Sequence, residues 1–295
     1  MNSPELFMDY NLEELVKKVD RLPTQLTVAR KVVVLCSDPQ THISKLIEVI
    51  SSDLSIFSQV LRIANSPYFN YPREITVLEQ AIIVLGSNLL RDIVLSIAIN
   101  SIYHGLKVNS DFNLNELWEH AFLTGLIGRA LGERYDPEKK DLLFIGGLFH
   151  DIGKLVQSQV IEKDFLLIFI KSRRENEKLH ILERRILGFH HGDIEGFLLQ
   201  KWNLAEIVVQ MVKFHHSPVE YIGEDEQLRL IRFIYLSDLL AHFIQNDLQT
   251  IADVDKLNKH FNRYFTFSNE EFDKLVNFTK QFLSSQKTFK QIAQI

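Results

Sequence analysis

The sequence predicts an all-α protein. Apolar residues recur at three- and four-residue spacing along most of the 295-residue chain, which is typical of amphipathic helices. No alternation of period two persists long enough to predict a sheet. Proline and glycine divide the stripes into short segments, so a series of many helices is expected.

The N-terminal part reads as a series of short helices with clear breaks. We expect helices over residues 12–19, 44–50, 54–64, 77–85 and 89–103. The first ends before Leu22-Pro23, because the residue before proline is pushed out of helical geometry. Thr76 is expected to cap the fourth, with Glu79 three positions later completing a capping box. Between the third and the fourth, Asn65-Ser66-Pro67 opens a loop with aromatic residues at 68, 69 and 71.

The rest of the chain continues the helical pattern. Further helices are expected over residues 111–135, 142–156, 164–180, 194–202, 205–214, 228–244 and 272–282. The helix over 228–244 is apolar nearly all round, which indicates burial. We divide the chain into an N-terminal helical subdomain (1–110), a second helical subdomain (111–250) and a C-terminal extension (251–295).

Composition excludes several classes of protein. A net charge of −5 and the absence of a basic cluster give no attraction to nucleic acid or to an anionic membrane. The longest run without a charged residue, Ile93 to Leu106, is shorter than the roughly 18–20 residues that span a bilayer. The polar, acidic N-terminus does not resemble a signal peptide, and the lone Cys36 allows no internal disulfide. We therefore expect a cytoplasmic protein.

The stretch over residues 142–156, LLFIGGLFHDIGKLV, organises the chain. It carries three glycines inside a helical pattern, at a cost of roughly 1 kcal/mol each, which indicates close backbone contact with a neighbour. It also carries the adjacent pair His150-Asp151, followed by Lys154. Imidazole and carboxylate are good ligands for a divalent cation. The alternative is an amphipathic helix whose polar edge happens to contain this pair.

Other histidines and one aspartate lie at borders of apolar stripes. His120 can shield the core or face the His150-Asp151 pair. His191 begins a helix, where a positive charge is disfavoured, so we expect it to be neutral and suited to ligation, with His190 facing solvent. His215 and His216 follow a helix C-terminus, which the helix dipole alone could explain. Asp238 lies in a buried helix and must be paired, either with His242 or with a metal ion.

Three segments carry a resemblance to a known family. They are LPTQLTVARKVVVLCSDP, LIEVISSDLSIFSQVLRIANSPYF and ITVLEQAIIVLGSNLLRDIVLSIAI, all between residues 22 and 99. In order and wording they resemble the N-terminal helices of the HDOD ("HD-related output domain") family of bacterial signalling modules. The resemblance covers roughly residues 10–245. It implies an HD-like helical bundle packed on an N-terminal helical subdomain.

The resemblance also implies a set of metal ligands. His120, His150-Asp151 and Asp238 resemble the H…HD…D pattern of the HD phosphohydrolase superfamily. In the related HD-GYP branch, which cleaves cyclic dinucleotides, the second ion is held at positions like those of His191, His215 and His216. Asp151 would then bridge the two ions and Lys154 would contact the substrate phosphate. The implied cofactor is a divalent metal, iron, manganese or zinc, with two ions as one option.

This sequence also departs from HD-GYP. SPVEYIG follows His215-His216 where a Gly-Tyr-Pro segment is expected, and Glu195 stands where the family usually has glycine. We therefore expect a regulatory module whose cleft holds a metal or nucleotide and which acts on a signalling partner protein, with homodimerisation as an option. The aromatic loop at 68–71 is the expected signalling element. The alternatives are a metal-dependent phosphohydrolase acting on a nucleotide or cyclic nucleotide, and a scaffold in which every histidine has a protein partner.

Overall fold

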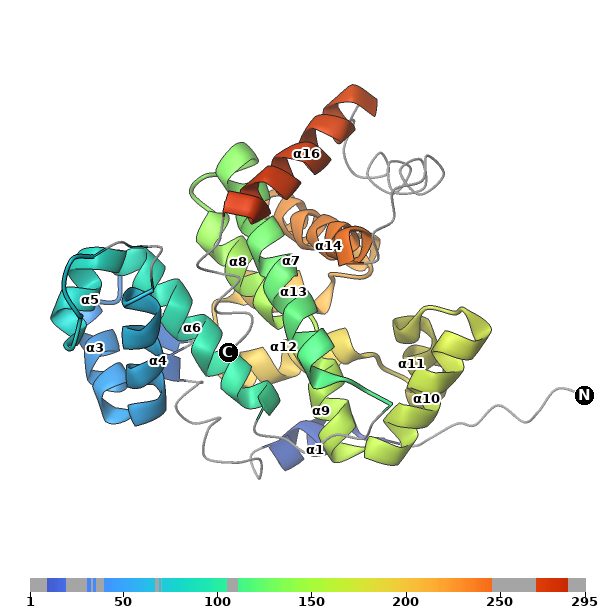
Figure 1. Cartoon of the computed structure of the whole chain (residues 1–295). Coiled ribbons are helices and arrows are strands. Elements are labelled where there is room, and N and C mark those ends of the chain that lie inside the picture. The colour runs from blue at the N-terminus through green and yellow to red at the C-terminus, as the bar shows by residue number, and fades with distance from the viewer. Residues whose placement is uncertain are drawn as a thin grey trace, which may run out of the picture. The chain divides into compact units, whose positions relative to one another are not determined.

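Helices make up all the regular structure in the part of the chain described by the computed structural model (Figure 1). The described residues are 10–19, 31–32, 34–35, 40–66, 69, 71–104, 111–245 and 269–285. Their helices are α1 (Leu12–Val19), α3 (Ile43–Ser52), α4 (Leu54–Ala64), α5 (Leu78–Leu85), α6 (Ser87–His104), α7 (Leu114–Tyr135), α8 (Lys140–Phe149), α9 (Ile152–Val160), α10 (Glu162–Glu175), α11 (Leu179–Leu187), α12 (His191–Lys201), α13 (Glu206–Lys213), the 3₁₀ turn η1 (Pro218–Glu220), α14 (Asp225–Gln245) and α16 (Asn269–Ser285). The predicted all-α class is confirmed.

The chain forms two compact units. Unit 1 comprises residues 1–22 and 107–280, and unit 2 comprises residues 23–106 and 281–295. Helix α1 belongs with the later helices, because it contacts α9 and α12 and buries Leu15 and Val16. Cys36 and Tyr68 lie outside the described residues.

Unit 2 contains the helices α3 to α6, which contact one another. The Asn65 side chain closes the loop after α4: its Nδ2 donates to the Ile75 carbonyl at 2.8 Å and its Oδ1 accepts from the Ile75 N–H at 2.7 Å. These two hydrogen bonds to the backbone of one residue explain why asparagine occupies this position of the Asn-Ser-Pro segment. The capping box expected at Thr76 is wrong: α5 begins one residue later, with Val77 at its N-cap and no side-chain cap.

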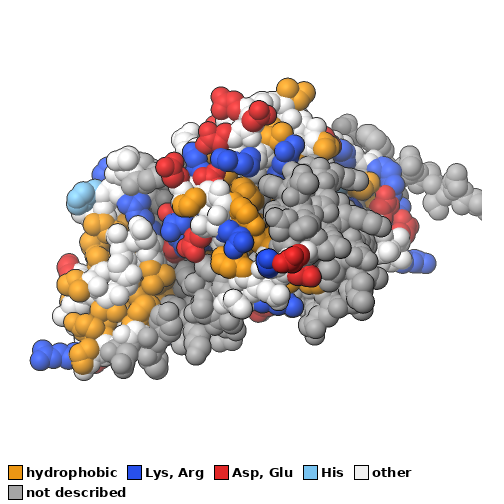
Figure 2. Space-filling view, turned by 90° about the horizontal axis from the view of Figure 1, so that it is seen from above, with side chains coloured by type: hydrophobic (Ala, Val, Ile, Leu, Met, Phe, Trp, Pro, Cys, Tyr) orange, Lys and Arg blue, Asp and Glu red, His pale blue; other side chains and the backbone are white. Residues whose placement is uncertain are grey.

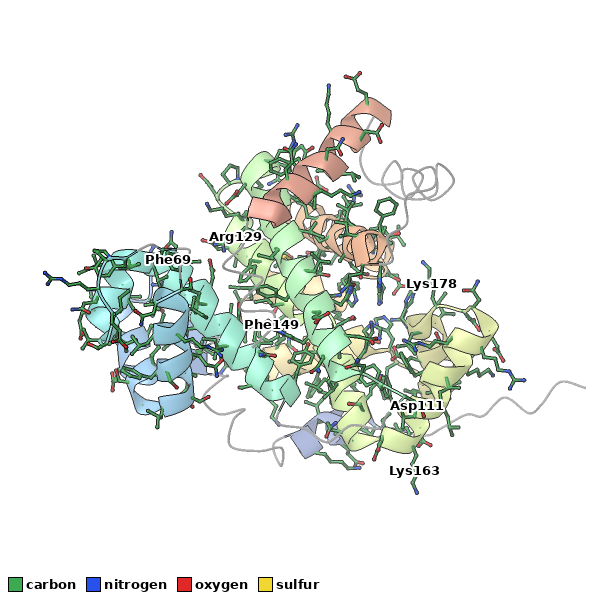
Figure 3. All side chains as sticks on the ribbon, in the orientation of Figure 1. Phe69, Asp111, Arg129, Phe149, Lys163 and Lys178 are labelled. Carbon is green, nitrogen blue, oxygen red and sulfur yellow. The ribbon has the colours of Figure 1, made fainter. Side chains whose placement is uncertain are left out.

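Unit 1 is built around α7 and α8, which approach each other at backbone distance. A Cβ on Gly147 of α8 would lie 2.5 Å from the Gly125 N and Cα of α7. Helix α14 also contacts both α7 and α8. Phe149, which ends α8, is fully buried and packs edge-on against Trp202, whereas Lys163 and Lys178 point outward (Figure 3). The close contact expected at the glycines of 142–156 is therefore confirmed.

Two helices expected to be continuous are broken. The predicted helix over 142–156 is divided into α8 and α9, and His150-Asp151 form the turn between them. The predicted helix over 164–180 ends at Asn176, whose φ of 52° is left-handed, and α11 begins at Leu179. Asparagine tolerates this conformation better than most residues, so it stops α10 as glycine would.

Among the described residues, no single helix is both long and apolar enough to cross a membrane. Helix α5 and residues Ser87–Tyr103 of α6 reach the required length and hydropathy only when taken together, and the two are bent by 114° where they join.

Candidate metal centre

Five segments of unit 1 bring the predicted ligands together. His120 lies on α7, and the His150-Asp151 turn joins α8 to α9. The remaining ligands come from later helices: His191 is the first residue of α12, His215 and His216 follow α13, and Asp238 lies on α14. The side chains of all seven except His216 are almost fully buried. Residues separated by more than a hundred positions therefore share one site.

One group contains His120, His150 and Asp238. His120 Nε2 lies 3.0 Å from Asp238 Oδ1, and His150 Nε2 lies 3.7 Å from the same oxygen. The two Nε2 atoms are 3.3 Å apart. One ligand atom from each of the three side chains lies within 4.8 Å of the other two, which is close enough for all three to bind one cation.

A second group contains Asp151, His191, His215 and His216. Asp151 Oδ1 lies 3.6 Å from His191 Nε2 and 3.9 Å from His215 Nε2. The Nε2 atoms of His191 and His216 are 2.9 Å apart. One ligand atom from each of these four side chains also lies within 4.8 Å of the other three.

Asp151 stands between the two groups. Its Oδ1 faces His191 and His215, and its Oδ2 lies 3.5 Å from His150 Nε2 and 4.0 Å from His120 Nε2. Asp151 Oδ1 and His215 Nε2 are buried and have no hydrogen-bond partner among the described residues. An unpartnered buried oxygen is costly, and a cation would satisfy both atoms at once.

Four histidines present the same nitrogen to the site because their other nitrogen is occupied. The Nδ1 of His150 donates to the Gly147 carbonyl at 2.7 Å, and that of His215 to the Val212 carbonyl at 2.5 Å. The acceptors for the other two, His191 and His120, are Glu183 Oε2 at 2.5 Å and Gln245 Oε1 at 2.8 Å. With the proton fixed on Nδ1, the neutral ring directs the lone pair of Nε2 inward, which is the arrangement of metal-binding histidines. The donor set therefore fits a divalent metal.

The HDOD domain family model matches residues 22–218, about two thirds of the chain. The chain belongs to the HDOD domain family. Solved structures with the same fold include a suggested phosphohydrolase from Shewanella amazonensis SB2B (TM-score 0.74, 18% identity, covering 96% of this chain and 97% of that one). An HDOD domain protein of unknown function from Geobacter sulfurreducens has a TM-score of 0.70 and 20% identity, and the match covers 91% of this chain and 96% of that one. A suggested signal transduction protein from Marinobacter aquaeolei VT8 has a TM-score of 0.66 and 20% identity, and the match covers 97% of this chain and 62% of that one.

A curated relative, an uncharacterized protein of Treponema pallidum (strain Nichols), is 23% identical over 240 residues. That match covers 80% of this HDOD chain and 45% of the relative, so the chain spans less than half of the relative's length.

Charge and burial set the ionisation of this HDOD site. Burial lowers the pKa of His191, His215 and His216 well below the usual value, so these rings are neutral near neutral pH. Burial opposes ionisation of Asp151, but nearby positive charge, above all that of Lys154, outweighs it and holds the pKa of that carboxyl well below its usual range. Neutral imidazole and ionised carboxylate are the forms that bind metal.

Two buried glutamates support the ligands: Glu195, noted in the sequence only as a departure from the family's glycine, and Glu183, which the sequence analysis did not single out. Glu183 of α11 accepts from both the backbone N–H and the Nδ1 of His191, and burial raises its pKa to about 7. Glu195 of α12 accepts from the Gly153 N–H at 3.0 Å. Glu183 falls between apolar residues of an amphipathic helix, so a charged residue at a buried position was the signal that could have identified it.

Three described histidines outside the two groups, His180, His190 and His242, have contacts with protein side chains or backbone. His190 is buried, not solvent-facing as expected, because its Nδ1 accepts from the Gly192 N–H and caps α12. His180 stacks on His216 with ring centroids 4.1 Å apart. Asp238 lies beside its predicted partner His242, whose Nε2 is 3.4 Å from Asp238 Oδ1. The same oxygen lies 3.0 Å from His120 Nε2 and 3.7 Å from His150 Nε2, and a metal partner stays a prediction.

A cavity of about 520 Å³ opens onto the ligand groups. Its walls include His120, Asp151 and Lys154, with Phe169 and Arg173 of α10 beside them. Lys154 Nζ donates to Asp151 Oδ2 at 2.6 Å, so the lysine lies beside the ligand groups, and its contact with a substrate phosphate stays a prediction. A ligand in this cavity would meet both a cationic side chain and the metal ligands.

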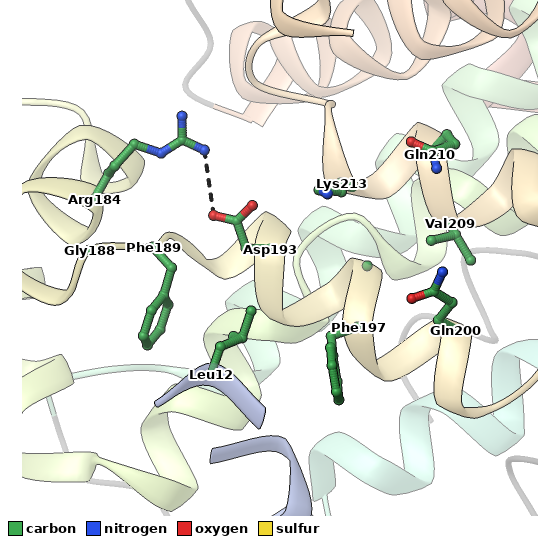
Figure 4. Close-up of a pocket in the computed structure, with 11 residues that line it drawn as sticks. Leu12, Arg184, Gly188, Phe189, Asp193, Phe197, Gln200, Val209, Gln210 and Lys213 are labelled. Carbon is green, nitrogen blue, oxygen red and sulfur yellow. Dashed lines mark hydrogen bonds and ion pairs between the residues drawn. The ribbon is translucent and has the colours of Figure 1, made fainter. Parts of the chain in front are cut away.

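A second cavity of about 450 Å³ is lined in part by residues of α1, α12 and α13 (Figure 4). Its floor includes Leu12, Phe189 and Phe197, and the Arg184–Asp193 ion pair (3.4 Å) borders it. None of the predicted ligands lines it, so the first cavity is the one associated with the metal centre.

Proposed function

We propose that this HDOD domain is a regulatory module that binds divalent metal in unit 1, with Asp151 shared between two ligand groups. The observation that carries the proposal is the unpartnered Asp151 Oδ1, buried between the Nε2 atoms of His191 and His215. His120, His150 and Asp238 would hold one ion, and Asp151, His191, His215 and His216 the other. Iron, manganese and zinc are the candidates, because these metals accept imidazole and carboxylate together.

Elemental analysis of the purified chain tests this proposal. The wild-type protein is expected to retain or take up iron, manganese or zinc, and His150→Ala is expected to lose at least one ion while remaining helical by circular dichroism. His42→Ala is the matched control, since His42 caps α3 in unit 2 and lies outside both ligand groups. Equal metal content in wild type and His150→Ala, or none in wild type after saturation with each metal, would refute the proposal.

The regulatory part of the proposal concerns a partner. The suggested signal transduction protein of Marinobacter aquaeolei shares the fold, and a family of output domains is expected to act through protein contact. Tyr71 of the aromatic loop is 45% exposed and therefore available to a partner. On the face drawn in Figure 2, acidic and basic side chains lie interspersed rather than in separate patches.

A second candidate function is metal-dependent phosphohydrolysis of a nucleotide or cyclic nucleotide. The cavity that joins Lys154 to Asp151 favours it, because a phosphate there would meet an ammonium group beside the ligands. Two proteins of Shewanella amazonensis with this fold are suggested phosphohydrolases, one of them metal-dependent (TM-score 0.51, 20% identity). Bound divalent ions supply Lewis-acid chemistry, which lowers the pKa of water and stabilises charge on phosphoryl oxygens.

If the protein is a phosphohydrolase, Lys154 holds the substrate phosphate, and Asp151 lies between the two ligand groups beside that phosphate. Hydrolysis of a nucleotide panel by the metal-saturated protein, lost in His150→Ala and in Lys154→Met, would support it. Absence of turnover in a protein that binds metal would leave the regulatory function as the one supported.

A further inference from the structure

The strongest unexplained feature is Glu195, a fully buried carboxylate near the metal ligands that is not itself in either group. Its Oε1 accepts a hydrogen bond from the Gly153 N–H at 3.0 Å. Gly153 is the second residue of α9, and Asp151 is the N-cap of that helix. A helix leaves its first N–H groups without partners, so a buried N-terminus needs an acceptor from elsewhere.

Asp151 would ordinarily be that acceptor. Aspartate is among the preferred N-cap residues, and its carboxylate normally accepts from the N–H two or three positions later, at Gly153 or Lys154. Here the Asp151 side chain makes no cap hydrogen bond. Its backbone (φ −119°, ψ 8°) is not in the extended region that capping residues adopt, and its carboxylate faces the histidines instead.

We propose that Glu195 is a positioning residue that caps α9 in place of Asp151 and so frees the Asp151 carboxylate for metal. Glu195 reaches α9 because the two helix starts are in direct contact: a Cβ on Gly153 would lie 2.3 Å from the His191 carbonyl oxygen. Glu195 lies four residues after His191, one turn further along the same face of α12. One helix thus supplies a ligand to the second group and an acceptor to the helix that follows Asp151.

The inference rests on the proposed metal function and adds a residue to it. Without Glu195, the Gly153 N–H would be buried and unpaired unless Asp151 took it. Rotation of Asp151 toward its own helix would withdraw its oxygens from His150, His191 and His215. Metal affinity would then fall although every ligand is still present.

Zinc affinity of Glu195→Leu and Glu195→Gln, measured by chelator competition, tests this. Glutamine keeps a carbonyl oxygen for the Gly153 N–H, so Glu195→Gln is expected to bind zinc like wild type. Leucine has no acceptor, and loss of such a supporting contact typically lowers affinity by roughly 10- to 100-fold. Leucine and glutamine are both neutral, so the difference between the two variants reports the hydrogen bond and not electrostatic attraction. Equal affinity of the two variants would overturn the inference.

A measurement on metal-free protein makes the test independent of the proposed function. If Asp151 takes over the cap in Glu195→Leu, adding Asp151→Ala should lower Tm by about 2–4 °C more in that background than in wild type. An equal effect of Asp151→Ala in both backgrounds would refute the exchange of caps. This cycle decides the inference even if wild type binds no zinc, and Glu195→Ala replaces Glu195→Leu if the larger side chain prevents folding.

Discussion

Replacing Gly147 with alanine tests the close contact of α7 and α8 on which the metal centre depends. The added Cβ would lie 2.5 Å from the Gly125 N and Cα and 2.7 Å from the Thr124 carbonyl carbon. Carbon atoms pack best at about 3.5–4.0 Å, so the two helices would have to separate by roughly 1 Å. The obstacle is backbone, which cannot move aside as a side chain can.

The expected loss of stability follows from two opposing effects. Overpacking costs typically 1–3 kcal/mol, and a clash with backbone belongs at or above the upper end, about 3 kcal/mol. Alanine returns about 1 kcal/mol through its higher helix propensity. Gly147→Ala should therefore lower the free energy of unfolding of unit 1 by about 2 kcal/mol.

Gly146→Ala is the matched control, since it makes the same change one residue away. The three atoms nearest its Cβ would all belong to side chains and not to backbone: Ile234 Cδ1 at 3.0 Å, Met211 Cε at 3.2 Å and Ile234 Cγ1 at 3.3 Å. These can yield, so the cost of about 1 kcal/mol is offset by the similar gain in helix propensity. We expect Gly146→Ala to be nearly neutral.

Urea unfolding followed by tryptophan fluorescence measures this difference in unit 1 alone. Both tryptophans of the chain, Trp118 and Trp202, are buried in unit 1. With a slope of about 2 kcal/mol per M, Gly147→Ala should lower the urea midpoint by about 1 M relative to Gly146→Ala. Equal midpoints would mean that α7 and α8 are not in backbone contact, and the reasoning about the glycines would fail.

Three further predictions concern the metal centre and its support. Zinc at about 100 times Kd should raise the free energy of unfolding of wild-type unit 1 by about 2.7 kcal/mol and that of Asp151→Ala by much less, as measured by the same fluorescence assay. Glu183→Gln should weaken zinc binding about tenfold, because glutamine holds the His191 Nδ1–H less strongly than a carboxylate; unchanged affinity in chelator competition would exclude that role. His190→Ala should cost about 1 kcal/mol through loss of the α12 cap yet leave the metal content unchanged in elemental analysis, and a loss of metal would assign His190 to the site instead.

The fold class could be predicted from periodicity because each helix buries an apolar stripe whatever its partner. Breaks between helices were harder. The apolar spacing continues through His150 and Asp151, so the pattern alone predicts one helix where the structure has two. Asn176 likewise ends α10 through its backbone conformation, which leaves little trace in hydrophobic spacing.

The ligand residues could be proposed from residue type and order, since histidine and aspartate on buried stripes are uncommon and chemically specific. Their supporting residues could not. In the sequence, Glu183 is a charged residue among apolar ones and Glu195 is a departure from the family's glycine, but only the tertiary contacts with His191 and Gly153 show that they support the ligands. For the same reason His190 was predicted to face solvent, whereas it caps its own helix from a buried position.

The break between α8 and α9 is what makes the site physically possible. In an uninterrupted helix, His150 and Asp151 would point about 100° apart, and one carboxylate could not face ligands from both sides. The turn places His150 Nε2 3.5 Å from Asp151 Oδ2 while Oδ1 faces His191 and His215. Such a turn buries a new helix N-terminus, and the Gly153 N–H must be satisfied there. Glu195 of α12 is therefore as necessary to the site as the ligands are. Without it, the turn that directs Asp151 to both groups would leave the Gly153 N–H without an acceptor.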